Sequence, residues 1–325
     1  MPRCRLGLVA AATLLVAACS TDGAGDTTTS APSTTPPTTT TTAVPGSEQL
    51  LDAACAGELS VQATGALDPS LTSVSGLAAS AQHDGIVWAA EDSLEPAVVT
   101  ALRTDGSTSG ASTVRAGLLA NVDWEALSFD HTLDEPRLYV GDLGDNLGIR
   151  PRVRLYELAE PDPTATTEVG PLRRLDLEYR RADGTPARPN AEALVVHGGA
   201  AWVIDKQPDG PATVYRAELD DPEGVLHEVG TLDLPDEQVT GVDLSPDATV
   251  LALRTNRAVR LLPATLDDQG RLDLVATLAG EGCTTPVPPE DQGEAITVLP
   301  GAVGLVTVGE DEGGTPVPMH VIAPG

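Results

Sequence analysis

Acidic side chains occupy two fixed places in a pattern that recurs five times along the chain, and together they could bind a hard cation. The first place is a polar residue that precedes Gly or Ala and then an apolar residue. The second place, 13 to 17 residues later, closes an apolar run. Ca²⁺ binds about six to eight oxygen atoms, whereas zinc favours His and Cys, so carboxylates at this density favour Ca²⁺. The acids at the first place are Glu125, Glu192 and Glu294, and those at the second are Glu91, Asp142, Asp205 and Glu310.

A glycine-rich loop offers further oxygen ligands beside this set. The run from Gly141 to Gly148 contains Asp145 and Asn146 as well as Asp142. Its spacing is not that of an EF-hand, but Asp145 joins the candidate metal ligands. The alternative is that these acids form salt bridges with Arg254, Lys206 and loop arginines, or are simply hydrated.

The recurring pattern predicts β-hairpins. Apolar residues alternate with others in short runs, and turn residues such as Asp84-Gly85 or Gly198-Gly199 separate the two runs of each copy. Such alternation is typical of strands rather than helices. Antiparallel pairing puts the start of the first strand beside the end of the second. We therefore expect both acidic places to lie on one rim of the fold.

The spacing of the copies predicts an all-β fold, a five-bladed β-propeller with four antiparallel strands in each blade. Most copies continue into two more strand-like runs, and successive copies begin 50, 67, 48 and 54 residues apart. Such repeats are typical of propeller blades, whose innermost strands crowd the axis and favour Gly or Ala. Six blades are the alternative because the second interval is long, and a β-sandwich is another. The last copy supplies three strands, so we expect the run Leu59–Thr64 to add the outer strand and close the ring.

The first 47 residues read as an export and anchoring segment. Residues 1–19 combine Arg3 and Arg5, an apolar run and Val16-Ala17-Ala18-Cys19, which is a bacterial lipobox. The apolar run is too short for a membrane-spanning helix, so residues 1–19 are expected to be a lipoprotein signal peptide, with Cys19 acylated. Residues 20–47, rich in Thr and Pro, are expected to form a disordered linker, and residues 48–325 the propeller domain.

Two further cysteines could form a disulfide. Cys4 leaves with the signal peptide and Cys19 takes the lipid, which leaves Cys55 and Cys283. An extracytoplasmic compartment permits a bridge between them, and it would staple the ring closed. Against this, Cys55 precedes the expected outer strand on the face opposite the loop that holds Cys283, so the pairing stays open.

The charge balance excludes some classes of partner. The chain carries a formal charge of −29, and without Arg3 and Arg5 it has 17 basic and 48 acidic residues, a charge of −31. Such a surface disfavours nucleic acid and anionic lipid and favours cations or basic partners. Acidity for solubility alone is the simpler explanation for most of these charges. We expect a monomer that is attached to the membrane through its lipid.

Motifs of common enzymes are missing from the sequence. There is no Gly-x-Ser-x-Gly elbow, no His-Glu-x-x-His, no P-loop and no Cys-x-x-Cys. We therefore favour an extracytoplasmic module that binds or scaffolds an unknown protein or small-molecule ligand, with a cation at its acidic mouth. The alternative is a calcium-dependent hydrolase of a phosphoester or lactone. Glu125, Glu192, Asp142 and Asp205 would then hold the metal, and a further acid would act as general base.

Several of these runs also carry a family resemblance. Asp123-Trp-Glu-Ala-Leu127, Gly141-Asp-Leu-Gly-Asp-Asn146, Asn190-Ala-Glu-Ala-Leu194, Val239-Thr-Gly-Val-Asp-Leu-Ser-Pro-Asp247 and Gln292-Gly-Glu-Ala-Ile296 resemble secreted or lipid-anchored β-propeller proteins of high-GC Gram-positive bacteria, with a WD40-like repeat. The resemblance covers most of residues 70–325 and implies a propeller and export. The acidic mouth is more distantly similar to that of β-propeller phytases, which implies clustered calcium ions. The arginines and lysines that such an enzyme places around phosphate are nearly absent here.

Overall fold

The computed structural model describes residues 46–325, except 93–94, 118–119, 289, 291 and 311–315. The expected signal peptide, its Cys19 and nearly all of the expected linker lie outside the described residues. Residues 44–325 form a compact unit of their own. No helix among the described residues is long and apolar enough to cross a membrane.

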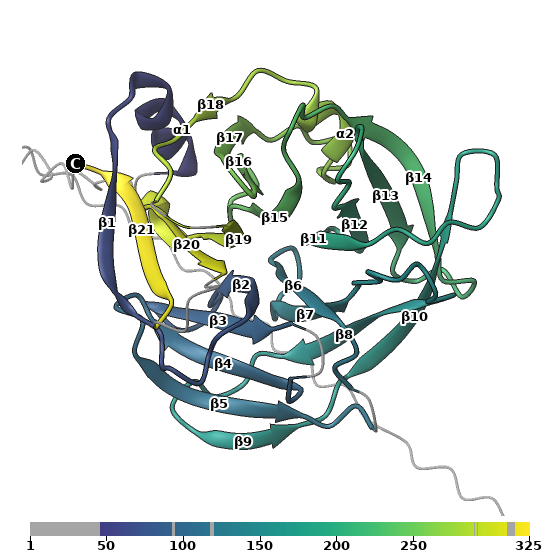
Figure 1. Ribbon diagram of the computed structural model, residues 1–325, viewed down its shortest axis with the longest axis horizontal. Helices are drawn as coiled ribbons and strands as arrows, with labels where there is room; N and C mark the ends of the chain where they lie inside the picture. Colours follow the sequence, from purple (N-terminus) through teal and green to yellow (C-terminus); the bar gives the residue numbers. More distant parts are fainter. Residues whose placement is uncertain (1–45, 93–94, 118–119, 289, 291, 311–315) are drawn as a thin grey trace, which may run out of the picture. The chain divides into compact units, whose positions relative to one another are not determined.

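The compact unit is built almost entirely from antiparallel strands (Figure 1). One sheet contains β2 (Val74–Ala79), β3 (Ile86–Glu91), β4 (Val98–Arg103), β5 (Thr108–Val114) and β9 (Thr166–Val169). An eight-stranded sheet contains β6 (Trp124–Asp130), β7 (Arg137–Asp142), β8 (Val153–Ala159), β10 (Arg173–Arg180), β14 (Val225–Leu232), β13 (Ala212–Glu218), β12 (Ala200–Asp205) and β11 (Ala191–His197). The remaining sheets contain β15 (Val239–Leu244), β16 (Val250–Thr255), β17 (Val259–Pro263) and β18 (Cys283–Thr284), and β19 (Gln292–Val298), β20 (Leu305–Glu310), β21 (Pro318–Pro324) and β1 (Leu59–Ala66).

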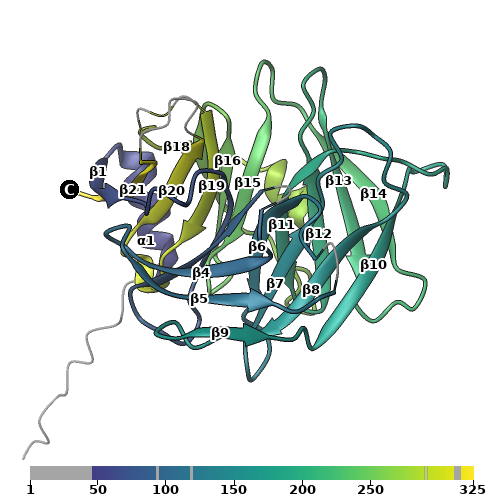
Figure 2. The same ribbon diagram turned by 60° about the horizontal axis from the view of Figure 1, so that its bottom comes forward.

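The first strands of the repeated hairpins, β2, β6, β11, β15 and β19, lie side by side around the centre of Figure 1. Each contacts the next in chain order, and β19 contacts β2 again. The later strands of each group lie progressively further out, as the turned view in Figure 2 also shows. Sheets set around a closed ring of inner strands define a β-propeller. The predicted all-β propeller is therefore the observed fold.

The N-terminal strand closes the ring as the sequence predicted. β1 pairs antiparallel with β21, from Leu59 opposite Pro324 to Ala66 opposite Pro318. The sheet that starts with β19 therefore takes its outer strand from the other end of the chain. This pairing covers the edge of β21 that would otherwise be open to another chain.

Two parallel pairings join outer strands of neighbouring strand groups, and the sequence did not predict them. β9 pairs with the outer edge of β5, and the end of β10 pairs with β14. The second pairing merges two hairpin groups into the eight-stranded sheet. The long interval that suggested a sixth blade is occupied by β8, β9 and β10.

Crowding at the axis explains the small residue of the repeat. A Cβ atom on Gly76 would lie 2.8 Å from the backbone nitrogen of Leu127, and one on Gly241 would lie 2.9 Å from the carbonyl oxygen of Glu294. Both distances are shorter than a van der Waals contact allows. At Gly76 and Gly241 the inner strands can therefore approach this closely only because these residues have no Cβ atom. The other three copies have alanine at this place.

The hydrophobic core lies between the faces of neighbouring sheets. Trp88, Tyr139 and Trp202 occupy equivalent positions on β3, β7 and β12, and each is at least nine-tenths buried. Trp88 also donates a hydrogen bond from Nε1 to Oε1 of Glu160, at 2.8 Å. Burial of such large aromatic side chains is a main contribution to the stability of the ring.

Helix α1 (Ser47–Ala56), which the sequence analysis did not predict, brings Cys55 to Cys283. The two cysteines form a disulfide. Cys283 lies in strand β18, paired with Leu261 of β17, rather than in a loop on the far face. Because α1 packs against β17 and β18, the geometric objection to the bridge disappears.

Removing this disulfide should destabilise the fold. The bridge spans 228 residues of sequence, and loss of a native disulfide typically costs about 2–5 kcal/mol. We expect Cys55→Ala with Cys283→Ala to lower the free energy of unfolding by that amount in urea denaturation. Reductant should bring the wild type down to the variant and leave the variant unchanged. Equal stability of the two proteins without reductant would contradict the prediction.

Candidate metal centre

A β-bulge lies at the same point of every inner hairpin. The strand register shifts between Val74 and Gly76, and it does so again at the corresponding place in the other four hairpins. A bulge leaves one residue unpaired and redirects its side chain. The residue skipped in each case is the polar marker of the repeat: Ser75, Glu125, Glu192, Thr240 and Glu294.

The bulges bring buried polar side chains to the mouth of the central channel. Ser75, Glu125, Glu192 and Glu294 line one cavity of about 30 Å³, together with Asp92, Lys206 and Glu310. Glu125, Glu192 and Glu294 are all less than a tenth exposed. About 10–15 Å³ accommodates one water molecule, so the cavity can hold an ion with a water.

Lys206 and the side-chain amide of Gln292 provide partners for the acids on one side of this cavity. The Nζ atom of Lys206 lies 2.7 Å from Oε2 of Glu192 and 3.7 Å from Oε1 of Glu294. Gln292 donates hydrogen bonds to both Glu294 and Glu310. Burial raises the pKa of Glu192 to about 8, although Lys206 acts in the opposite direction. One alternative from the sequence was that Lys206 forms salt bridges with acids of the rim. The structure shows such pairs on this side of the mouth.

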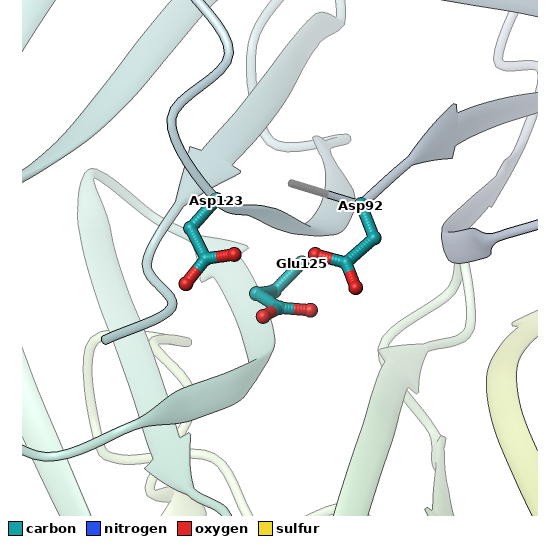
Figure 3. Close-up of side chains that lie close together, drawn as sticks. All are labelled: Asp92, Asp123 and Glu125. Carbon is teal, nitrogen blue, oxygen red and sulfur yellow. The ribbon is translucent and has the colours of Figure 1, made fainter. Parts of the chain in front are cut away.

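Three carboxylates converge on the other side of the mouth, Asp92, Asp123 and Glu125. One oxygen from each lies within 4.8 Å of the others, and Figure 3 shows the carboxylates turned toward a common space. Asp92 directly follows β3, and Asp123 precedes the first residue of β6. Asp123 and Glu125 are 7% and 4% exposed. Three oxygens so close together are the donor set of a hard cation.

The pKa of Glu125 is raised well above its ordinary value, first by burial and then by the charges of Glu192, Asp92 and Asp123. No donor within the described part of the chain makes a hydrogen bond to its carboxylate. A buried carboxylate without such a donor is stable only when it is protonated or faces a cation. The charge of Lys206 acts in the opposite direction but does not restore the ordinary pKa of Glu125.

Gly144 forms a backbone wall against these carboxylates. A Cβ atom there would lie 2.3 Å from Oδ2 of Asp123 and 2.4 Å from Oε1 of Glu125. The amide of Gly144 donates to the carbonyl oxygen of Asp123 at 3.2 Å. Only glycine lets the loop after β7 pass this close to the acids. Asp92, Asp123 and Glu125 are therefore the candidate ligands of a cation at this place, with the backbone of Gly144 directly beside two of them.

The other predicted ligands lie outside this cluster. Asp142 is fully buried between Arg150 and Arg154, at 2.7 and 3.3 Å. Asp145 accepts hydrogen bonds from the backbone amides of Ile149 and Arg150. Both carboxylates therefore hold the loop after β7 in place.

Asp205 and Glu91 also have local partners. Asp205 accepts from the amide of Thr213 at 2.6 Å, and Glu91 accepts from that of Thr72 at 3.0 Å. Of the eight predicted metal ligands, the structure brings Glu125, Glu192, Glu294 and Glu310 to one cavity and leaves Glu91, Asp142, Asp145 and Asp205 out of its lining.

The bulge explains why Glu125 faces the cavity and Asp142 of the same hairpin does not. Asp142 pairs directly with Trp124, so the two side chains share a face of the sheet, and that face packs into the core. Glu125, one residue further on, is the bulged residue and turns toward the axis. From the sequence pattern, the acids at both ends of a hairpin were expected to face the same rim. The pattern did not indicate Asp92 or Asp123. The available signal was an Asp directly after Glu91 and another two residues before Glu125.

Arg254 also departs from its expected role. It is fully buried and pairs with Glu290, which precedes β19, instead of with the acids of the mouth. Gly293 makes room for the guanidinium, since a Cβ atom there would lie 1.7 Å from its Nη2. Burial raises the pKa of Glu290 to about 7.

No protein-family model and no curated protein matches this sequence. Among solved structures, the PQQ-bound aldose sugar dehydrogenase of Streptomyces coelicolor is similar, with a TM-score of 0.46 and 11% identity over 82% of this chain and 99% of that one. A luciferin-regenerating enzyme has a TM-score of 0.41 and 9% identity over 82% and 95% of the two chains. A nidogen/laminin complex has 0.40 and 13% over 74% and 73%.

The buried acids predict an inverted dependence of stability on pH when chelator removes cations. A carboxylate with a raised pKa favours its protonated form in the folded state. The free energy of unfolding should therefore fall as pH rises from about 4.5, the ordinary glutamate value, to about 8, the pKa of Glu192. Glu125→Gln removes one buried charge and should be more stable than wild type at pH 8 by about 1–3 kcal/mol, and nearly equal to it at pH 5.

Urea denaturation at a series of pH values with chelator present measures this difference. Glu281→Gln changes an exposed glutamate outside the cavity and serves as the control. Parallel curves for wild type and Glu125→Gln would show that Glu125 is not a buried, uncompensated carboxylate.

Proposed function

We propose that this protein is a lipid-anchored, extracytoplasmic β-propeller of five blades that binds one divalent cation at its channel mouth and acts as a binding or scaffolding module. The observation that carries the proposal is the cluster of Asp92, Asp123 and Glu125, whose ligand oxygens lie within 4.8 Å of one another. Ca²⁺ is the favoured cation because every ligand is a carboxylate oxygen.

The inner strands, rather than the sheets, support a count of five blades. Each of the five bulged hairpins begins its own group of four strands, although the pairing of β10 with β14 merges two groups into one sheet. Each group has its own inner strand in the ring around the channel. These features support counting the eight-stranded sheet as two blades.

Charge balance supports one cation rather than several. Lys206 already faces Glu192 and Glu294, so those acids have a positive partner. Burial and the charges of Glu192, Asp92 and Asp123 raise the pKa of Glu125, and Lys206 offsets them only in part. A divalent cation would supply the missing charge there, and Gly144 leaves the space for it.

The size of the cavity favours binding over catalysis. A volume of about 30 Å³ suits an ion and its water, whereas small-molecule sites typically have about 300–1,000 Å³. The hydrolase alternative needs room for a phosphoester or lactone beside the metal and a base in reach of it. We therefore propose that the cation organises the mouth, and that a partner binds on loops carried by the rigid ring.

Export and anchoring rest on the sequence of the first 47 residues. The lipobox that ends at Cys19 supports acylation, and the Thr- and Pro-rich stretch supports a spacer between the membrane and the domain. The disulfide between Cys55 and Cys283 agrees with an oxidising compartment outside the cytoplasm. We propose a monomer on the outer face of the cell membrane.

Ca²⁺ should stabilise residues 44–325 against heat. Binding to the folded state alone adds about 2.7 kcal/mol at a concentration roughly a hundred times Kd, and this raises Tm. We expect a Ca²⁺-specific rise in Tm over chelator, with a smaller rise in Mg²⁺. Glu125→Gln and Asp123→Asn should each abolish it.

Two further variants sharpen this experiment. Gly144→Ala keeps every carboxylate but pushes a methyl group into the space between them, and it should also lose the Ca²⁺ response. Asp205→Asn removes a buried acid of the same rim that lies outside the cluster, and it should keep the response. An unchanged Tm of the wild type in Ca²⁺, or an equal rise in Glu125→Gln, would overturn the cation site.

A further inference from the structure

A short loop at the channel mouth exposes two large aliphatic side chains. Leu147 and Ile149 follow β7 on the way to β8, and they are 79% and 64% exposed. They are the two most exposed of the large hydrophobic residues in the described part of the chain. A single exposed leucine needs no explanation, but two on one ordered loop beside a candidate site point to an interaction.

Hydrogen bonds fix the shape of this loop. The carboxylate of Asp145 accepts from the amides of Ile149 and Arg150 at 2.9 and 2.8 Å, and its carbonyl oxygen accepts from the amide of Gly148. The side-chain oxygen of Asn190 accepts from the amide of Asp145 at 2.7 Å. The loop is thus built to present Leu147 and Ile149 to solvent, at little further entropic cost on binding.

Arginines brace the loop and surround it. The guanidinium of Arg150 donates to the carbonyl oxygen of Gly144 at 2.5 Å and to Asp142 at 2.7 Å. Arg188 donates to the carbonyl oxygen of Gly148 at 3.5 Å and is itself exposed, and the side chain of Arg152 is 50% exposed. Arg188 thus contacts the loop itself, and Arg152 follows the loop by two residues, where its guanidinium donates to the carbonyl oxygen of Asp176 and lies 3.8 Å from Glu178.

The loop begins a segment of the chain in which basic and acidic residues are equal in number. Residues 145–190 contain eight basic and eight acidic residues, whereas the rest of the chain after residue 19 contains nine basic and forty acidic ones. Glu125, Glu192 and Glu294 of the adjoining mouth are buried. The overall charge disfavours an anionic surface, but this segment, with balanced charge, is repelled by phosphate groups less than the rest of the chain taken together.

We propose that the Asp145–Arg150 loop docks shallowly into a phospholipid bilayer, with Leu147 and Ile149 among the acyl chains and Arg152 and Arg188 at the headgroup phosphates. Aliphatic side chains flanked by arginines are suited to the membrane interface. A protein interface of ordinary size buries about 800 Å² on each partner, far more than two protruding side chains offer. The geometry therefore fits a lipid surface better than a protein partner.

The inference builds on the proposed membrane attachment. Two aliphatic side chains alone give weak binding, but a tether keeps the domain beside the bilayer and raises its effective concentration there. Docking of this loop would hold the channel mouth at the membrane surface in a fixed orientation. The lipid anchor would attach the domain to the membrane, and the docked loop would fix the orientation of the domain.

An artificial tether tests the docking whether or not Cys19 is acylated. Residues 44–325, with an N-terminal hexahistidine tag, are held on phosphatidylcholine vesicles that contain a nickel-chelating lipid. An environment-sensitive fluorophore is attached to Leu147→Cys, since Cys55 and Cys283 are bonded to each other. We expect a several-fold rise in emission, a shift to shorter wavelength, and quenching by lipid with a nitroxide on its acyl chain.

Leu133→Cys carries the matched control label. Leu133 is an exposed leucine in the turn between β6 and β7, at the opposite end of the hairpin from Asp142, and its label should show neither the shift nor the quenching. Ile149→Asp and Arg188→Glu, each added to Leu147→Cys, should reduce both signals. Circular dichroism confirms that these variants are folded.

Identical behaviour of the labels at positions 147 and 133 would overturn the proposal. So would a label at 147 that stays in water on vesicles but becomes shielded on membranes that contain protein, since the loop would then bind a protein instead. Loss of the Ca²⁺ response with intact quenching would sink the cation site and leave the docking in place.

Discussion

The close approach of inner strands at the axis is the constraint on which the rest of this structure depends. Backbone atoms of neighbouring strands leave no room for a Cβ atom at Gly76 and Gly241, and the other three copies have alanine, the smallest side chain, at this place. The strand accommodates this crowding with a bulge one residue earlier, and the bulge turns the marker side chain inward. The acidic mouth is therefore a direct result of how the ring closes.

Much of the fold could be predicted from the sequence because strand alternation and a repeated small residue are local signals. The hairpins, the propeller and the closing strand β1 follow from them. The parallel pairing of β10 with β14 could not be predicted, since its hydrogen bonds join residues far apart in the chain and leave no periodic trace. Helix α1 was missed because it is short, only Leu50 and Ala54 of its apolar residues are buried, and its N-cap is a glycine without a side-chain hydrogen bond.

Less of the candidate site than of the fold could be predicted from the sequence. Recurrence identified Glu125, but recurrence also selected Asp142, which is the counterion of Arg150 and Arg154. The difference between them is a shift of one residue in register, and a pattern of residue types does not encode such a shift. Asp123 has no acidic equivalent in the other copies, and Asp92 has one only in the fifth, as Asp311. Neither residue belongs to the five-fold pattern, so their position in space is what joins them to Glu125.

The disulfide also determines how the domain carries mechanical load. A pull applied at the N-terminal end reaches α1 first, and from Cys55 it passes through a covalent bond to Cys283 in strand β18. Strand β1, which begins three residues after α1, therefore receives little of that force. The hydrogen bonds between β1 and β21 close the ring. They would break one after another if a force pulled β1 away from one of its ends. A force on the N-terminal side of the domain therefore leaves the pairing of β1 with β21 intact.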